Sequence, residues 1–273
     1  MMLRLARAAL YTAIPAELLL AVLLVSGVPL PTPVMVATEA VVAGVLALEA
    51  VTAYRLYRTA RGAGADRRAA LRDSVDALVP VKVRKLLEFE LNGIASLFLW
   101  VARRRHGVPP GGRAVPYSKE QSTTLMIMLF VMVVETVGID LLLAALDVPT
   151  AVRVTVLVLD LYSILFALAF AAACVTRPHV VTDEELRVRF GAYFDLRIPR
   201  ELITSVRVSR NYNETGTIHV AGGRLSVAVG SQTNVVVELA APITVTRPLG
   251  ARETVTSVRF FADTPHALRL QEA

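Results

Sequence analysis

The feature that most constrains the fold of this chain is a series of apolar runs in its first two thirds, each about 20 residues long. A helix of that length, at about 1.5 Å per residue, crosses the roughly 30 Å hydrocarbon layer of a bilayer. The chain is 273 residues long and 55% hydrophobic, which is more apolar surface than a soluble protein of this size readily buries. The sequence therefore predicts an integral membrane protein, with spans at about residues 10–30, 34–54, 123–146 and 152–175.

Basic residues flank these runs unevenly, and this asymmetry predicts the orientation. Arginines are frequent in residues 55–72, whereas the proline-rich turn 27–33 contains neither Lys nor Arg. By the positive-inside rule, the arginine-rich segments lie in the cytosol. We therefore expect a multi-pass protein of the plasma membrane with both termini cytoplasmic. The net charge of +6 is concentrated beside the apolar runs, so the expected partner is the lipid bilayer and not nucleic acid.

The segment at about residues 80–104, between the two predicted hairpins, is too polar for a typical span. Asn92 and Ser96 fall near one helical face, and Leu91 and Phe98 fall on another. This pattern favours an interfacial or re-entrant helix. The alternative, a fifth crossing, would move the arginines of residues 103–105 to the outside, against the charge rule.

From Val180 the composition changes to short β-branched runs separated by turn residues such as Gly222-Gly223 and Gly230-Ser231. Eight such runs between residues 185 and 261 predict an antiparallel meander that forms a small barrel or sandwich, closed by a short helix at 264–272. The expected division is a transmembrane helical domain, 1–176, and a cytosolic β-rich domain, 177–273.

Two stretches carry a family resemblance. Residues 181–191, Val-Thr-Asp-Glu-Glu-Leu-Arg-Val-Arg-Phe-Gly, and residues 198–206, Ile-Pro-Arg-Glu-Leu-Ile-Thr-Ser-Val, resemble the opening of bacterial pleckstrin-homology-like (PH-like) domains. The whole chain is also similar to actinobacterial integral membrane proteins, a family that implies no reaction. The resemblance implies a bacterial plasma-membrane protein. The expected fold is thus a membrane α-helical bundle of about four transmembrane helices with an interfacial or re-entrant helix, followed by an all-β PH-like barrel ending in a short helix.

Carboxylates inside the apolar runs are the sharpest chemical signal, because each costs about 2.5 kcal/mol or more near the centre of a membrane helix. The candidate intramembrane polar site consists of Glu17, Glu39, Glu135 and Asp160. If their helices pack face to face, these groups meet in a pocket that binds cations, relays protons or receives a basic ligand. The alternative is protonated carboxyls that hydrogen-bond neighbouring helices. Asp140 lies at the outer level where Arg153 begins the next span, so we interpret it as structural.

A second set of candidates is a group of arginines in the first strands of the β-rich domain. They are Arg187, Arg189, Arg197, Arg200, Arg207 and Arg210. Each one near an anionic leaflet would add about 1 kcal/mol of attraction, so we interpret them as candidate lipid-surface contacts, with solvated outward-facing strand positions as the alternative. Cys174 is the only cysteine and no histidine lies in a predicted span, so no metal site is expected. No phosphate loop, catalytic serine motif or dinucleotide motif is present, and no cofactor or catalytic residue is expected.

The sequence favours a non-enzymatic membrane protein with a regulatory or assembly role, whose PH-like domain docks at the inner leaflet, with its anionic lipids, or on a protein partner. Two alternatives stay open. One is a cation- or proton-coupled transporter that uses the intramembrane carboxylates, and the other is an intramembrane enzyme acting on a lipid or isoprenoid.

Overall fold

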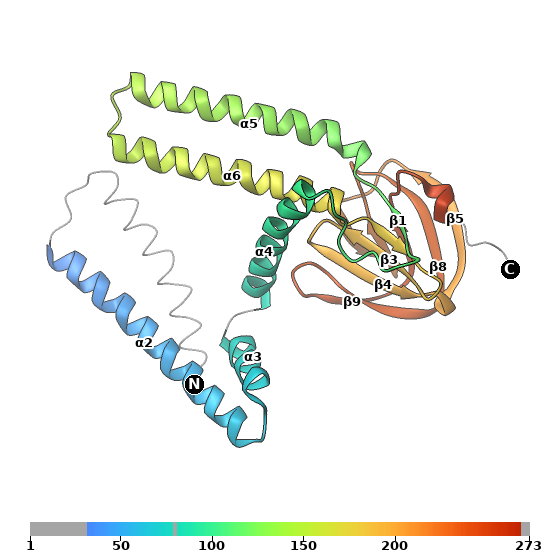
Figure 1. Cartoon of the computed structure of the whole chain (residues 1–273), viewed down its shortest axis with the longest axis horizontal. Coiled ribbons are helices and arrows are strands. Elements are labelled where there is room, and N and C mark those ends of the chain that lie inside the picture. The colour runs from blue at the N-terminus through green and yellow to red at the C-terminus, as the bar shows by residue number, and fades with distance from the viewer. Residues whose placement is uncertain (1–31, 79–80, 269–273) are drawn as a thin grey trace. The chain divides into compact units, whose positions relative to one another are not determined.

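The computed structural model describes residues 32–78 and 81–268, which contain five α-helices and nine strands in two sheets (Figure 1). The chain forms two compact units. The first consists of Met1–Arg84 with Val137–Leu159, and the second of Lys85–Thr136 with Asp160–Ala273. The second unit contains all nine strands of the described residues.

The first unit contains helices α2 (Thr32–Gly62) and α3 (Arg67–Leu78), which are separated by a short turn. Gly64 lies in this turn with φ of 91°, a conformation that is unfavourable for residues with a Cβ atom. The side chain of Asp66 then accepts a hydrogen bond from the backbone N–H of Ala69 (2.6 Å), which caps the start of α3. Local turn chemistry therefore ends one helix and starts the next.

Helices α5 (Lys119–Ala145) and α6 (Thr150–Thr176) are the two apolar helices that are long enough to cross a bilayer among the described residues. Few side chains in their most apolar windows are buried, 6% for α5 and 22% for α6, whereas the core helix of a soluble protein would be mostly buried. Asp147 adopts φ of 52° after α5, where the N–H of Val148 bonds the carbonyl of Leu143 (3.1 Å). This C-terminal cap, followed by Pro149, separates the two helices.

Helix α4 (Val81–Val101) ends in the same kind of cap. The N–H of Arg104 donates to the carbonyl of Leu99 (2.8 Å), and Arg103 adopts φ of 54°. Glycine is the usual residue at this left-handed position, so an arginine here costs about 1 kcal/mol of backbone strain. The polar side chains Asn92 and Ser96 face inward on α4, whereas Leu91 and Phe98 are exposed.

The first sheet is antiparallel and has the order β1-β2-β3-β4. Its strands are β1 (Arg113–Val115), β2 (His179–Val181), β3 (Glu185–Phe190) and β4 (Phe194–Pro199). The second sheet has the order β5-β8-β9-β7-β6, in which β7 and β9 are parallel. Its strands and the flanking 3-10 turns are η1 (Arg200–Leu202), β5 (Ile203–Asn211), β6 (Ile218–Ala221), β7 (Arg224–Val227), β8 (Thr233–Thr246), β9 (Arg252–Phe260) and η2 (Pro265–Leu268).

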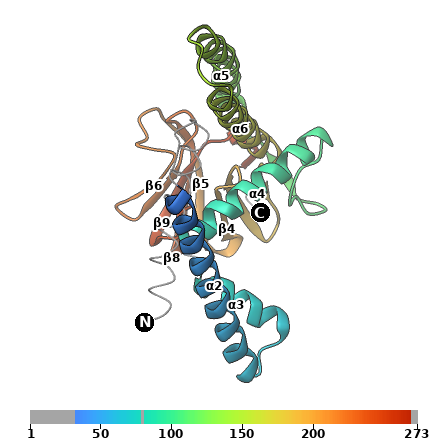
Figure 2. The same cartoon turned by 90° about the vertical axis from the view of Figure 1, so that its left-hand side faces the viewer.

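The hydrophobic core lies between the two sheets because their strands alternate buried and exposed side chains. Strand β4 shows this alternation along its whole length, with Phe194, Leu196 and Ile198 buried. They join residues of the second sheet, such as Val237 and Phe260, in one buried cluster. Helix α4 lies on the side of this sandwich that carries β4 (Figure 2).

The predicted fold class is wrong. The described residues form a mixed α/β structure with two candidate membrane helices, not a four-span helical bundle. The predicted span 10–30 lies outside the described residues. The predicted span 34–54 lies within α2, which is helical but on average less apolar than α5 and α6, because this helix continues into the arginines of residues 55–61.

The predicted antiparallel meander is also wrong. The parallel β7–β9 pair and the order of the second sheet require crossovers, and strand β1 comes from the segment before α5. Most of the predicted strand positions are nevertheless confirmed, and the runs 235–239 and 243–247 form the single long strand β8. The predicted terminal helix corresponds to the 3-10 turn η2, and residues 269–273 lie outside the described residues.

Candidate functional site: an arginine cleft

Arg189 on β3 is a buried cation that links the first sheet to the turn after α4. Its side chain is 2% exposed. The guanidinium donates to the carbonyl of His106 (2.8 Å) and to that of Gly107 (3.3 Å), and it forms an ion pair with Asp195 (3.5 Å). Burial lowers the pKa of Arg189, and the Asp195 carboxylate opposes this effect. Removing this charged group from water is costly unless its hydrogen bonds are kept, so the guanidinium fixes the turn at residues 103–107 to the sheet.

Gly107 is adapted to this contact. It has φ of 64°, and a Cβ atom added to it would lie 2.6 Å from Nη2 of Arg189. The neighbouring N–H of His106 donates to the carbonyl of Thr176 at the end of α6 (2.8 Å). The turn is therefore held on one side by the sheet and on the other by the end of α6.

His179 and Tyr117 form a neutral buried layer beside Arg189. Nδ1 of His179 accepts the backbone N–H of Arg189 (3.0 Å), so the proton lies on Nε2 and is donated to the carbonyl of Phe261 (2.8 Å). Burial lowers the pKa of His179 to about 4. The hydroxyl of Tyr117 accepts the N–H of Gly191 (2.6 Å), and burial raises the pKa of Tyr117 well above its ordinary value. Both groups are uncharged at neutral pH, and among the described residues Arg189 is the one fully buried side chain that carries a charge.

Arg177, directly after α6, binds the polar face of α4. Its Nε donates to the hydroxyl of Ser96 (3.1 Å), and its Nη2 donates to the side-chain carbonyl of Asn92 (3.1 Å). One turn earlier on α4, Phe89 packs against Phe166 of α6 and stacks on Tyr193 beside β4. Helix α4, the end of α6 and the first sheet therefore form one packed junction.

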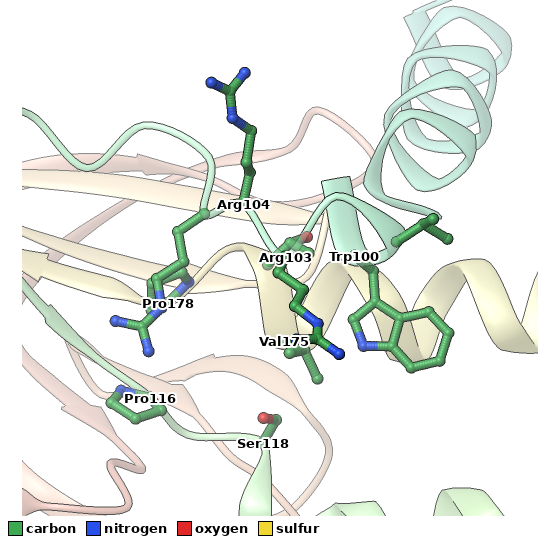
Figure 3. Close-up of a pocket in the computed structure, with 10 residues that line it drawn as sticks. Trp100, Arg103, Arg104, Pro116, Ser118, Val175 and Pro178 are labelled. Carbon is green, nitrogen blue, oxygen red and sulfur yellow. The ribbon is translucent and has the colours of Figure 1, made fainter. Parts of the chain in front are cut away.

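The packed junction surrounds a cleft of about 560 Å³ that we call the arginine cleft (Figure 3). It is lined by Trp100, Val101, Arg103, Arg104, Arg105, Pro116, Ser118, Val175, Thr176 and Pro178. Arg103 extends along the side of the cleft that carries Trp100, and Arg104 extends in the opposite direction (Figure 3). The cleft is therefore lined by three exposed arginines, of which Arg104 points away from the side that carries Trp100, together with an indole ring and a hydroxyl group, and none of its lining residues is acidic.

The predicted carboxylate pocket is not assembled by the described residues. Glu17 and the side chain of Glu39 lie outside the described part of the structure. Glu135 is exposed on α5 and Asp160 is half-buried on α6, and within the described residues neither forms a hydrogen bond or an ion pair. Asp140, by contrast, pairs with Arg153 at 3.1 Å, as their positions in the sequence indicated.

The six predicted lipid-contact arginines come from β3, β4, η1 and β5, and several of them bond other side chains. Arg187 forms an ion pair with Asp195, and Arg189 is buried as described above. Arg207 pairs with Glu238, and Arg210 bonds the side chain of Gln232 and lies over the ring of Tyr212. Arg197 on β4 is exposed and Arg200 in η1 is half-buried. The group is divided between two sheets.

Sequence reasoning treated the arginines of residues 103–105 as a membrane flank and missed that they line a cleft. Their clustering three residues after the only tryptophan was the available signal, because tryptophan and arginine both favour the membrane interface. In residues 32–78 and 81–268, no group of His, Cys, Asp and Glu side chains is arranged to hold a metal ion.

Comparison with protein-family models, with curated proteins and with solved structures finds no match for this chain. The functional argument therefore rests on the geometry of the junction and the cleft.

Proposed function

We propose that this protein is a non-enzymatic membrane module in which α5 and α6 cross the bacterial plasma membrane as one hairpin. The β-rich part then docks at the cytosolic face of the inner leaflet, in a regulatory or assembly role. The observation that carries this proposal is the pairing of β1 with β2, which brings together the chain before α5 and the chain after α6.

This pairing constrains the path of the chain through the bilayer. Val115 pairs with His179, so the chain leaves the sheet only a few residues before α5 and returns to it a few residues after α6. Two crossings that begin and end at one sheet form a hairpin with both ends on the same side. The apolar side chains of α5 and α6 are largely exposed, which supports lipid as their solvent.

Charge supports a cytosolic position for the β-rich part. Basic residues cluster at the sheet end of the hairpin, at residues 103–105, Arg113, Lys119 and Arg177. At the other end, the one basic side chain near the 146–149 connection is that of Arg153, which is paired with Asp140. The positive-inside rule then favours the cytosol for the sheet end.

Helix α4 supports docking at the inner leaflet rather than simple tethering. Its exposed face is apolar and includes Leu91, Phe98 and Val101, while its polar face is bonded to Arg177. An exposed stripe of this kind on a helix packed beside the end of α6 fits an interfacial helix that lies in the headgroup layer. Such a helix would hold the sandwich at a constant height above the bilayer.

The test uses cysteine labelling, because the native Cys174 is buried and is the only cysteine. Thr150→Cys places a thiol at the α5–α6 connection, and Leu249→Cys places one in the exposed loop between β8 and β9. A membrane-impermeant maleimide applied to intact protoplasts should label the first variant only, and lysis should expose the second. Labelling of the Leu249→Cys variant in intact protoplasts would contradict the proposal. Recovery of the protein in the soluble fraction of cells lysed without detergent would also contradict it.

A further inference from the structure

The arginine cleft has the chemistry of a binding site for an anionic headgroup, an inference that rests on the proposed membrane position. Arg103, Arg104 and Arg105 are exposed and form no ion pair with any other residue of the described chain. Unneutralised guanidinium groups in a concave site favour phosphate, because the planar group donates two parallel hydrogen bonds to its oxygens. The cleft volume of about 560 Å³ is typical of small-molecule sites.

The position of the arginines is maintained against a conformational cost. Arg103 occupies the left-handed cap of α4, where glycine would be less strained. The turn that follows is held by Arg189 and by the bond from His106 to Thr176. The backbone of the three arginines is therefore held in place by these contacts, which lowers the entropy lost on binding a ligand.

The helix ends around the cleft do not cancel this charge. The C-terminal ends of α4 and α6 each contribute roughly half a negative charge, which would disfavour an anion. The carbonyl of Thr176 at the end of α6 already accepts the N–H of His106, and Ser118 places the positive end of α5 at the cleft. The full positive charges of the lining arginines outweigh the residual dipoles.

We infer that the arginine cleft binds the phosphate headgroup of an anionic inner-leaflet phospholipid, with the acyl chains continuing along the apolar faces of α4 and α6. Trp100 and Val175 line the cleft and are exposed, and Val101 is exposed at the end of α4. A lipid fits this arrangement better than free phosphate, because the charged and the apolar parts of the cleft are contiguous.

Trp100 makes the test direct, because it is the only tryptophan of the chain and it lines the cleft. The full-length protein is reconstituted into nanodiscs of phosphatidylcholine that contain a small fraction of phosphatidylglycerol. Brominated acyl chains are placed on one lipid or on the other, and the quenching of Trp100 fluorescence is measured. Each basic residue at the surface favours an anionic lipid about fivefold, so brominated phosphatidylglycerol should quench at a mole fraction at least about fivefold lower than brominated phosphatidylcholine.

Two variants distinguish lipid binding at the arginine cleft from a general attraction of the lipid to basic residues elsewhere on the protein. The triple variant R103Q/R104Q/R105Q removes the three positive charges that line the cleft and should lose most of the preference for phosphatidylglycerol. The matched control R67Q/R68Q/R72Q removes the same number of exposed arginines from α3 and should keep the preference. An unchanged preference in the R103Q/R104Q/R105Q variant, or a lost preference in the control, would overturn the inference.

The experiments with the two brominated lipids also distinguish a failure of this inference from a failure of the proposed function. If fully brominated phosphatidylcholine leaves Trp100 unquenched, the cleft is not at the bilayer and both proposals fail. If it quenches Trp100 without any excess for phosphatidylglycerol, only the lipid site fails. Inorganic phosphate added to the mixed nanodiscs should not relieve the quenching at millimolar concentration, and relief would assign the cleft to a soluble phosphate instead.

Discussion

Replacing Arg189 with methionine tests whether the buried guanidinium holds the junction together. Methionine keeps much of the volume but removes the bonds to the carbonyls of His106 and Gly107. A hydrogen bond from a charged group contributes about 1.5–3 kcal/mol. Asp195 is 40% exposed and keeps its bonds to Arg187, so the lost ion pair adds little. We expect a loss of about 3 kcal/mol, which lowers the melting temperature by about 6–12 °C for a unit of this size.

The assay follows Cys174, whose thiol is buried under the same junction. A thiol-reactive dye that fluoresces on reaction reports its exposure as the detergent-solubilised protein is heated. The matched control is Arg207→Met, which removes a solvent-exposed pair with Glu238 and should shift the melting temperature by about 2 °C or less. Equal shifts in the two variants would refute the claim that the buried position makes Arg189 the stronger contact.

Three further predictions concern the same unit. Gly107→Ala should destabilise the fold by about 1–3 kcal/mol, measured by the same dye, because the new Cβ displaces Arg189. Phe89→Ala should cost about 3 kcal/mol in the same assay, whereas Phe98→Ala, at a side chain that is 73% exposed, should cost less than about 0.5 kcal/mol. His179 has a pKa lowered to about 4, so between pH 6.5 and 4 the unfolded chain binds a proton that the folded chain does not. The free energy of unfolding should therefore fall by up to about 3 kcal/mol as the pH drops through this window, and the melting temperature should fall with it. The variant His179→Gln should show a smaller pH dependence.

The local elements could largely be predicted from the sequence, because their signals lie in neighbouring residues. The apolar runs identified α5 and α6, and the short run at residues 193–198 identified β4. The prediction of four spans fails in the described residues, where α5 and α6 are the two helices that are long and apolar enough to cross a bilayer. The run at residues 34–54 forms the first part of α2, a helix that continues into the arginines of residues 55–61 and is therefore less apolar on average than α5 and α6.

The candidate site was less predictable. The arginines of residues 103–105 were visible as a membrane flank, but their neighbours in the cleft, such as Ser118 and Pro178, come from other segments. Arg187 and Arg189 resembled surface arginines, yet they are engaged by Asp195 and by the turn after α4. Alternation along a strand does not reveal what a long side chain meets across the fold.

The sequence by itself indicated where α4, α5, α6 and most of the strands lie, because the period of the apolar residues sets these elements locally. Only the tertiary structure decided that β1 joins β2 across the α5–α6 hairpin, that β7 runs parallel to β9, and that Arg189 bonds His106, 83 residues away. Those contacts depend on which distant segments exclude water from one another and on which buried carbonyls lack a partner, and neither property is encoded in a stretch of neighbouring residues.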